Sequence, residues 1–116
     1  MILSIVGTRD YTNYDNFKNI VNKYIEEVGI PQEIVSGGAK GVDTLAEIYA
    51  HEHNIPIKIF KPDWSKFGRA AGILRNTDII NYSTHVLALP NEKSVGTIDS
   101  INKAKLQNKF LKVVNI

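Results

Sequence analysis

Short apolar runs rich in β-branched residues alternate along this chain with longer segments of helical periodicity. This alternation is typical of a parallel sheet with helices on both faces, because parallel strands need long crossover connections. It predicts an α/β fold: a single Rossmann-like three-layer sandwich with a mainly parallel five-stranded sheet, formed by residues 1–116. The predicted strands are Ile2–Val6, Glu33–Ser36, Ile55–Phe60, Val86–Leu89 and Phe110–Val114.

The segments between these strands predict four helices. In the first, apolar residues recur at helical spacing from Phe17 to Val28, and Gly29 ends the helix. We expect Ile73 of the third helix and Ile98 of the fourth to face the core. The second, third and fourth helices are predicted over Val42–His53, Gly68–Tyr82 and Thr97–Gln107.

Composition narrows the classes of function. With 43% hydrophobic and 22% charged residues, the chain resembles an ordinary globular domain that buries one core. Its net charge of +2 is too balanced for a protein that coats nucleic acid or an anionic membrane, but it suits a small anionic ligand. The absence of cysteine excludes disulfides and thiolate chemistry. With no basic leader and no membrane-length apolar run, we expect a cytoplasmic protein with no membrane partner.

In open α/β sheets, ligands bind beyond the carboxyl ends of the strands. The segments that follow the first four predicted strands are rich in glycine and polar residues, so we expect them to meet at one edge of the sheet. They are Gly7–Asp10, Gly37–Gly41, Lys61–Trp64 and Pro90–Thr97.

The strongest of these signals is the glycine-rich turn after the second strand. Glycines let backbone N–H groups surround an anion, and the helix that follows adds the positive end of its dipole. The turn predicts a phosphate site, although glycine also serves tight packing at such turns. Lys40 could contact the phosphate or be solvated, and Asp43 could hold a ribose hydroxyl, order the turn or favour the helix N-terminus. The ligand residues predicted here are Ser36, Gly37, Gly38, Ala39, Lys40, Gly41 and Asp43.

Arg9 stands directly beyond the first strand. There a guanidinium can grip a phosphate or carboxylate in a bidentate fork, and Gly7 leaves backbone room beside it. A surface ion pair with Asp10 or another carboxylate is the alternative. The ligand residues predicted in this segment are Gly7, Thr8 and Arg9.

The segment after the third strand adds weaker candidates. Trp64 could stack on a base, or it could serve packing or an interface. A glycine inside a helix lowers the stability of that helix by about 1 kcal/mol relative to alanine. Gly72 therefore indicates that something packs closely against the helix there: a ligand, strand backbone or a second subunit. The ligand residues predicted from this region are Asp63, Trp64, Arg69, Arg75 and Asn76.

The start of the fourth helix offers a second set of N–H donors and hydroxyls. It suits either a second phosphate or simple helix capping. Ser94, Gly96 and Thr97 are the predicted ligand residues. The three histidines lack the spacing of a metal site, so neither a metal nor another cofactor is predicted.

Taken in order, five blocks of this chain resemble the signature blocks of the SLOG superfamily, and in particular its short, single-domain YspA-like branch. The resemblance implies a Rossmann-like nucleotide-binding domain related to the core of the DNA-processing protein DprA and to the LOG phosphoribohydrolases. It also implies a pocket formed after strands one, two and four, and assembly into dimers or larger oligomers. The blocks are Ile5–Arg9, Ser36–Asp43, Pro62–Trp64, Gly68–Asn76 and Ser94–Thr97.

One departure from the LOG pattern bears on catalysis. LOG enzymes carry a P-G-G-x-G-T-x-x-E block whose glutamate serves in cleaving the N-glycosidic bond, and Ser100 falls at its place here. Asp99 is one position away, which turns a side chain by about 100° around the helix axis. LOG-type activity is therefore not expected, and no catalytic residue is assigned.

The residues and the resemblance together predict a protein that binds a phosphate-bearing nucleotide derivative of the NAD or ADP-ribose type. It would act as a sensor or a sequestering protein, since related SLOG domains are associated with NAD-derived signals in bacterial antiphage defence. The expected partners are this small molecule and further copies of the chain. A nucleotide or nucleoside hydrolase and a DprA-like DNA-binding module remain as alternatives, the latter disfavoured by the near-neutral charge.

Overall fold

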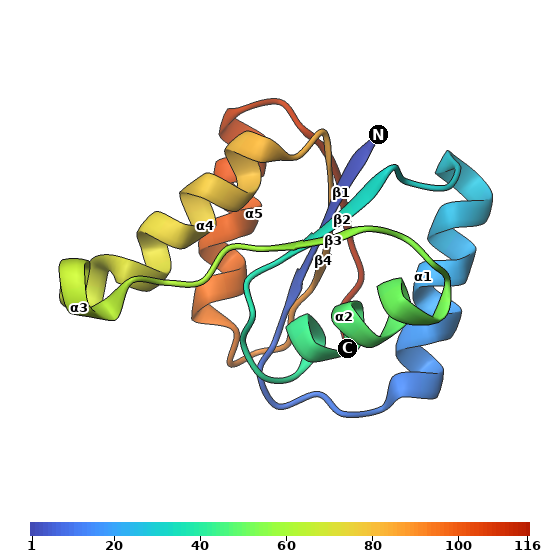
Figure 1. The fold of residues 1–116 in the computed structure, drawn as a ribbon, viewed down its shortest axis with the longest axis horizontal. Coiled ribbons are helices and arrows are strands. Elements are labelled where there is room, and N and C mark those ends of the chain that lie inside the picture. Colours follow the sequence, from blue (N-terminus) through green and yellow to red (C-terminus); the bar gives the residue numbers. More distant parts are fainter.

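A computed structural model describes residues 1–116, which form a five-stranded sheet between two layers of helices (Figure 1). The strand order is β3-β2-β1-β4-β5, and every neighbouring pair is parallel. This confirms the Rossmann-like fold, and the winding reverses direction between β1 and β4. The strands are β1 (Ile2–Gly7), β2 (Glu33–Ser36), β3 (Ile57–Ile59), β4 (His85–Leu89) and β5 (Phe110–Val113).

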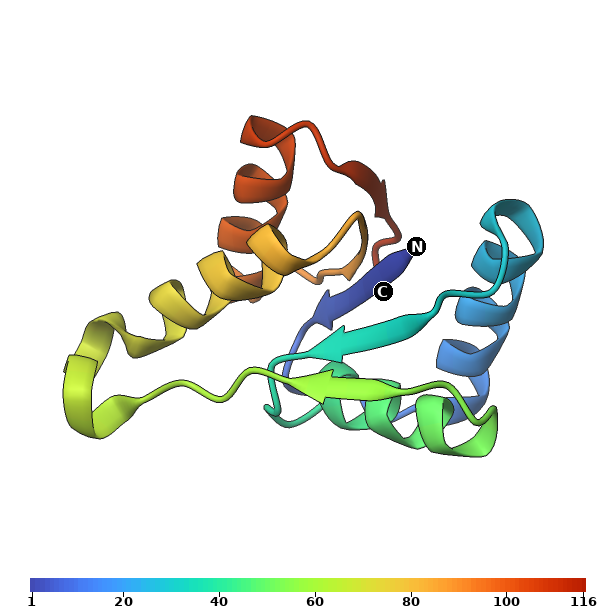
Figure 2. The same cartoon turned by 45° about the horizontal axis from the view of Figure 1, so that its top comes forward.

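The helices divide between the two faces of the sheet. Figure 2 shows α1 and α2 on one side and α4 and α5 on the other, as right-handed crossovers require when the chain winds first toward β3 and then toward β5. No helix has both the length and the apolar character needed to cross a bilayer. The helices are α1 (Tyr14–Val28), α2 (Val42–Glu52), α3 (Trp64–Phe67), the 3₁₀ turn η1 (Gly68–Ala70), α4 (Ala71–Tyr82) and α5 (Val95–Leu106).

The largest departure from the sequence expectation lies between β3 and α4. A continuous helix from Gly68 was expected, but the short helix α3 ends at Gly68, which has a φ of +55°, and α4 begins only after the 3₁₀ turn. The third strand is also shorter than expected, because Ile55 N–H donates to Ala50 O and so completes the end of α2 instead of joining the sheet.

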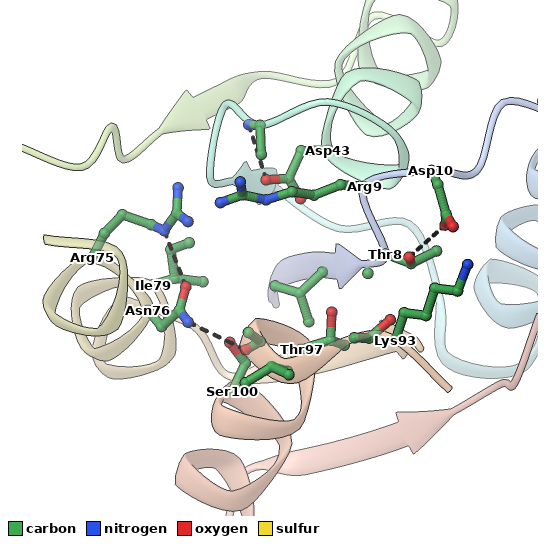
Figure 3. Close-up of a pocket in the computed structure, with 16 residues that line it drawn as sticks. Thr8, Arg9, Asp10, Asp43, Arg75, Asn76, Ile79, Lys93, Thr97 and Ser100 are labelled. Carbon is green, nitrogen blue, oxygen red and sulfur yellow. Dashed lines mark hydrogen bonds between the residues drawn. The ribbon is translucent and has the colours of Figure 1, made fainter. Parts of the chain in front are cut away.

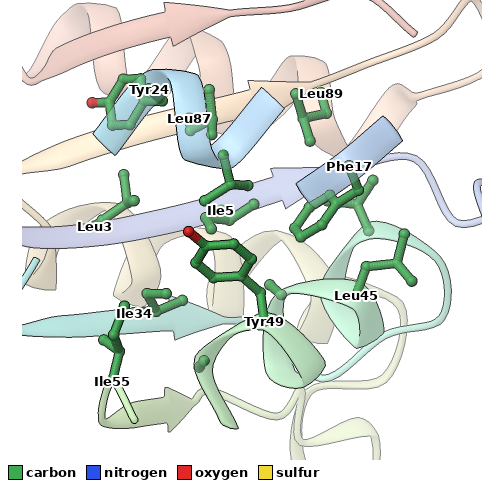
Figure 4. Close-up of a cluster of buried hydrophobic side chains, with 14 residues drawn as sticks. Leu3, Ile5, Phe17, Tyr24, Ile34, Leu45, Tyr49, Ile55, Leu87 and Leu89 are labelled. Carbon is green, nitrogen blue, oxygen red and sulfur yellow. The ribbon is translucent and has the colours of Figure 1, made fainter. Parts of the chain in front are cut away.

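Two hydrophobic clusters hold the layers together. The larger lies between the sheet and α1 and α2 (Figure 4), where Tyr49 is buried and its hydroxyl donates to Asn22 Oδ1 at 2.6 Å. The smaller cluster lies under α4 and α5 and consists of Val6, Val35, Ile79, Ile80, Val86, Ala88, Ile101 and Ala104.

Two residues expected in the core are exposed. Ile73 is 56% exposed because the first half of α4, together with α3, projects beyond the sheet (Figures 1 and 2). Ile98 is 47% exposed because α5 packs through Ile101 and Ala104 instead. Of the close neighbours expected at Gly72, the strand backbone is not one: a Cβ built there would meet only the Trp64 ring, at an ordinary contact distance of 3.6 Å.

Gly41 marks the tightest approach between two loops. It has a φ of +72°, and a Cβ at this position would lie 2.4 Å from Thr8 O and 2.5 Å from the carbonyl carbon of Arg9. The next residue, Val42, donates its N–H to Thr8 O at 3.1 Å. The turn after β2 is therefore packed directly onto the backbone that follows β1.

We expect Gly41→Ala to lower the free energy of unfolding by more than about 2 kcal/mol, because it adds both a steric overlap and an unfavourable φ. Gly72→Ala is the matched control. It should raise the free energy of unfolding by up to about 1 kcal/mol, since alanine favours the helix and a methyl group fits there. Urea denaturation of both variants measures this, and equal effects would contradict the described loop contact.

Candidate functional site

The loops after β1 and β4 surround a cavity of about 390 Å³ at the point where the strand order reverses (Figure 3). This is the edge at which open α/β sheets bind ligands. The lining residues come from the end of β1, the turn before α2, α4, and the start of α5. They are Val6, Gly7, Thr8, Arg9, Asp10, Ala39, Asp43, Arg75, Asn76, Ile79, Lys93, Ser94, Val95, Gly96, Thr97 and Ser100.

The glycine-rich turn reaches this cavity only through Ala39 and Asp43. Two of its N–H groups are already bonded within the turn: that of Gly38 to Ser36 Oγ at 3.3 Å, and that of Ala39 to Asp43 Oδ2 at 3.1 Å. Gly37 is needed for another reason, because a Cβ there would lie 2.6 Å from Arg75 Nη1 and 2.8 Å from Asp43 Oδ2. The turn thus brings an arginine and a carboxylate close to the main chain.

Arg75 is a buried residue of α4 whose guanidinium is held at two points. Nη1 donates to Gly37 O, and Nε donates to Asn76 Oδ1 at 3.0 Å. Asn76 is itself fixed, since its Nδ2 donates to Gly96 O and to Asp99 Oδ2, both at 3.2 Å. Burial lowers the pKa of Arg75, with nearby Asp43 opposing the shift, but a guanidinium remains protonated. A fixed positive charge therefore faces the cavity.

Arg9 extends across the cavity toward Asp43 and Arg75 (Figure 3). It makes neither an ion pair nor a hydrogen bond within the chain, so the surface pair with Asp10 that the sequence left open is not formed. Arg9 and Arg75 together place two guanidinium groups around one carboxylate. This part of the cavity retains an excess positive charge.

Asp43 is a buried carboxyl at the first turn of α2. Burial raises its pKa, while the Ala39 N–H and the charges of Arg75 and Arg9 partly offset that shift. One carboxylate oxygen accepts the Ala39 N–H, and the other oxygen has no partner in the chain. Asp43 can therefore accept a hydrogen bond from a ligand or exchange a proton with one.

The start of α5 supplies further donors. The Ser94 hydroxyl accepts the Asn91 N–H at 2.9 Å and donates to Asn91 Oδ1 at 3.0 Å, and it makes no cap bond to the helix. The N–H groups of Gly96 and Thr97 in the first turn consequently have no acceptor within the chain. They are available to an anion, and the helix dipole favours negative charge there.

Asp10 lies at the rim of the cavity on the side away from Arg75 (Figure 3). It connects the loop after β1 to the loop after β4. Its Oδ1 accepts the Thr8 hydroxyl at 2.7 Å and the Asn91 side-chain amide at 2.9 Å. These bonds, with the charge of Lys93, lower the pKa of Asp10, the Thr8 hydroxyl having the largest effect. Asp10 therefore remains a carboxylate that shapes the rim.

Ten of the residues predicted from sequence meet at this cavity. They are Gly7, Thr8, Arg9, Ala39, Asp43, Arg75, Asn76, Ser94, Gly96 and Thr97. The others lie outside the lining. These are Ser36, Gly37, Gly38, Lys40, Gly41, Asp63, Trp64 and Arg69.

Among the residues outside the lining, the last three belong to the projecting α3 region. Asp63 caps α3 by accepting the Lys66 N–H at 3.1 Å, and the Trp64 ring packs beside Gly72. Arg69 is exposed in the 3₁₀ turn. Asp63 thus has a capping role and Trp64 a local contact, whereas the side chain of Arg69 makes no hydrogen bond or ion pair within the chain.

Three polar lining residues were not predicted as ligand residues. Ser100 could have been placed beside Thr97 from their spacing of three residues on one helix. Asp10 and Lys93 lie in two of the segments that were expected to meet at this edge, Gly7–Asp10 and Pro90–Thr97, but neither residue was singled out by its type or spacing. No group of three His, Asp or Glu side chains is arranged to hold a metal ion.

A second hollow of about 340 Å³ lies between α1 and β5. Five of its eight lining residues are hydrophobic, and its charged residues are of both signs. Its lining residues are Ile20, Lys23, Tyr24, Glu27, Leu87, Lys112, Val113 and Val114.

Fold and cavity together define a Rossmann-like α/β protein with a polar cavity at the switch point of its sheet. The model of the YspA, cpYpsA-related SLOG family matches residues 1–67, and the chain belongs to this family. The matched part contains the first two loops of the cavity, whereas α4 and α5 lie beyond it.

Two individual proteins are similar to this chain. The Gene 61 protein of Mycobacterium phage D29 is 33% identical in an alignment of 78 residues that covers 62% of this chain and 62% of the phage protein. The X-ray structure of DNA processing protein A (DprA) from Streptococcus pneumoniae matches with a TM-score of 0.77 at 18% identity, over 97% of this chain and 49% of that one. The second match shows a shared fold, and this chain spans about half the length of DprA.

Asp43 gives the site a testable pH dependence. Because its pKa is raised above the ordinary 3.8, the folded state holds this proton more tightly than the unfolded state does. The contribution of the Asp43 carboxyl group to the free energy of unfolding therefore decreases as the pH rises from about 4 through the raised pKa. Asp43→Asn removes this loss, so the variant should gain stability relative to the wild type over that interval and then stay level.

Asp63→Asn is the control for this measurement. The Ser65 hydroxyl and the Lys66 N–H lower the pKa of Asp63, so its stabilising share is present above about pH 4 and is lost in more acidic solution. Relative to the wild type, the Asp63→Asn variant should lose stability as pH rises. Urea denaturation across pH measures both, and a flat difference for Asp43→Asn would contradict the buried carboxyl described above.

Proposed function

We propose that this chain binds a phosphate-bearing nucleotide derivative, of the NAD or ADP-ribose type, in the cavity at the carboxyl ends of β1 and β4. One observation carries the proposal: two guanidinium groups, Arg9 and Arg75, and the free N–H groups at the start of α5 reach the same cavity. Donors of this kind bind phosphate through charge-assisted hydrogen bonds.

The dimensions and lining of the cavity suit a small ligand. A volume of about 390 Å³ falls within the range of roughly 300–1,000 Å³ found for small-molecule sites. Val6 and Ile79 add apolar surface against which a sugar or base could pack. A ligand with an anionic group and a flat or cyclic organic part fits this combination.

Membership of a SLOG family and the similarity to a phage protein support a role in signalling. We propose that the protein is a cytoplasmic sensor or sequestering protein for such a nucleotide in bacterial or phage defence. Further copies of the chain are the proposed macromolecular partners. Such a protein needs to bind its ligand but need not convert it.

Calorimetric titration and urea denaturation with ADP and with adenosine test the proposal, because ADP is the part shared by NAD and ADP-ribose. At about 100 times its dissociation constant, ADP should add about 2.7 kcal/mol to the free energy of unfolding. Adenosine at the same concentration should add far less, since it lacks the group that the cationic side would bind. Equal effects of the two compounds would contradict the proposal.

Arg9→Ala provides the matching test of the site. It should weaken ADP binding by about 1.5 to 3 kcal/mol, the usual range for a hydrogen bond to a charged group, and leave the fold intact. Arg69→Ala is the control, because Arg69 carries the same charge on the projecting segment outside the cavity. An equal loss of affinity in both variants would indicate a general charge effect.

A nucleotide or nucleoside hydrolase is the second candidate, favoured by Asp43. A buried carboxyl with a raised pKa beside a cavity is suited to proton transfer. For LOG-type cleavage, however, Ser100 offers no carboxylate, and Asp99 lies outside the lining, bonded to Asn76 and Lys103.

Incubation of the purified protein with AMP and with cytokinin nucleotides should therefore release no free base. Multiple turnover that is lost in Asp43→Asn would instead establish the hydrolase and assign Asp43 as its acid or base. The DNA-binding alternative rests on the fold shared with DprA, and single-stranded DNA as a competitor in the ADP titration tests it.

A further inference from the structure

Two hydroxyl groups of α5 have no hydrogen-bond partner in the chain. Thr97 and Ser100 are three residues apart, so they project from one face of the helix, and both line the cavity. They are only 5% and 1% exposed. Every fully enclosed side-chain polar atom of the protein has a partner, so these two hydroxyls open into the cavity.

Comparable hydroxyls in α4 and at its C-terminal cap are bonded to that helix. Thr77 donates to Ile73 O at 3.2 Å, and Ser83 donates to Ile79 O at 2.7 Å. A bond to the carbonyl four residues earlier is the usual alternative for a helical serine or threonine. Thr97 and Ser100 make no such bond, and a nearly buried polar group without a partner is unfavourable. A ligand group that bonds here would remove that cost.

The side chains of α4 and α5 that flank the two hydroxyls carry no unpaired charge. Asn76 beside them has its amide nitrogen engaged by Gly96 O and Asp99 Oδ2, and Asp99 is paired with Lys103 at 2.7 Å. Figure 3 shows Arg9 and the guanidinium of Arg75 on the opposite side of the cavity. The cavity therefore has a cationic side at Arg9 and Arg75. Facing it are the two uncharged hydroxyls, with the free N–H groups at the start of α5 and the side chain of Lys93 also in the lining.

We propose that Thr97 and Ser100 bind the ribose hydroxyls of the ligand, so that the site selects ribonucleotides over deoxyribonucleotides. This inference rests on the proposed function and deepens it. A phosphate only accepts hydrogen bonds and calls for positive charge, whereas a sugar hydroxyl both donates and accepts, as do Thr97 and Ser100. Two vicinal ribose hydroxyls match two protein hydroxyls one helical turn apart.

The test measures dissociation constants by calorimetry for ADP, 2′-deoxy-ADP and 3′-deoxy-ADP. The wild type should bind ADP roughly fivefold more tightly than either deoxy compound, as expected for a lost hydrogen bond. Ser100→Ala and Thr97→Val should each reduce this preference, and the double variant should reduce it to less than about twofold. Affinity for the deoxy compounds should change little, because the deleted partner is already absent.

Thr77→Val is the matched control, since it removes a hydroxyl that bonds to its own helix outside the cavity, and it should keep the full preference. Equal wild-type affinity for all three nucleotides, or an undiminished preference in the double variant, would overturn the inference and leave the proposed function standing. Absence of ADP binding in the wild type would overturn both.

Discussion

The hydrogen bond from Arg75 to the Gly37 carbonyl links α4, on one face of the sheet, to the turn that leads into α2, on the other face. It requires a glycine at position 37, because a Cβ there would overlap the guanidinium. It also requires Asn76, which holds Nε of Arg75 and is itself anchored to the start of α5. Three of the segments around the cavity are thus connected through two adjacent buried side chains, Arg75 and Asn76.

Charge balance at this point explains why the site is suited to an anion. A buried guanidinium needs compensation, and Asp43 supplies part of it without forming an ion pair within 4 Å. Arg9 then adds a second positive charge with no partner of its own. An incoming phosphate would complete the arrangement, and the free N–H groups of α5 would share in binding it.

Sequence alone predicted the fold well because the alternation of apolar runs and helical periodicity reflects backbone geometry directly. It failed where tertiary arrangement decides. Gly68 ends α3 and delays α4, and Ile73 is exposed because no sheet lies beneath that part of α4. Neither feature has a signature in local periodicity.

The site, like the fold, was predicted from the sequence in part. The rule that ligands bind beyond the strand ends placed the loops of Arg9 and Thr97 at one edge, and the structure brings them to one cavity. The rule could not show that the N–H groups of Gly38 and Ala39 form hydrogen bonds within their own turn. Nor could it show that Lys93 reaches the cavity, since that depends on the path of the loop after β4.

The most direct test of the account is a ¹⁵N–¹H NMR titration of the protein with ADP, because it locates binding at single residues. The account predicts saturable shifts concentrated at the amides of Gly96 and Thr97 and at the Arg9 side chain, with the residues of the hollow between α1 and β5 unaffected. Shifts centred instead on Ile20 and Lys112 of that second hollow, or no saturable shift at all, would contradict it.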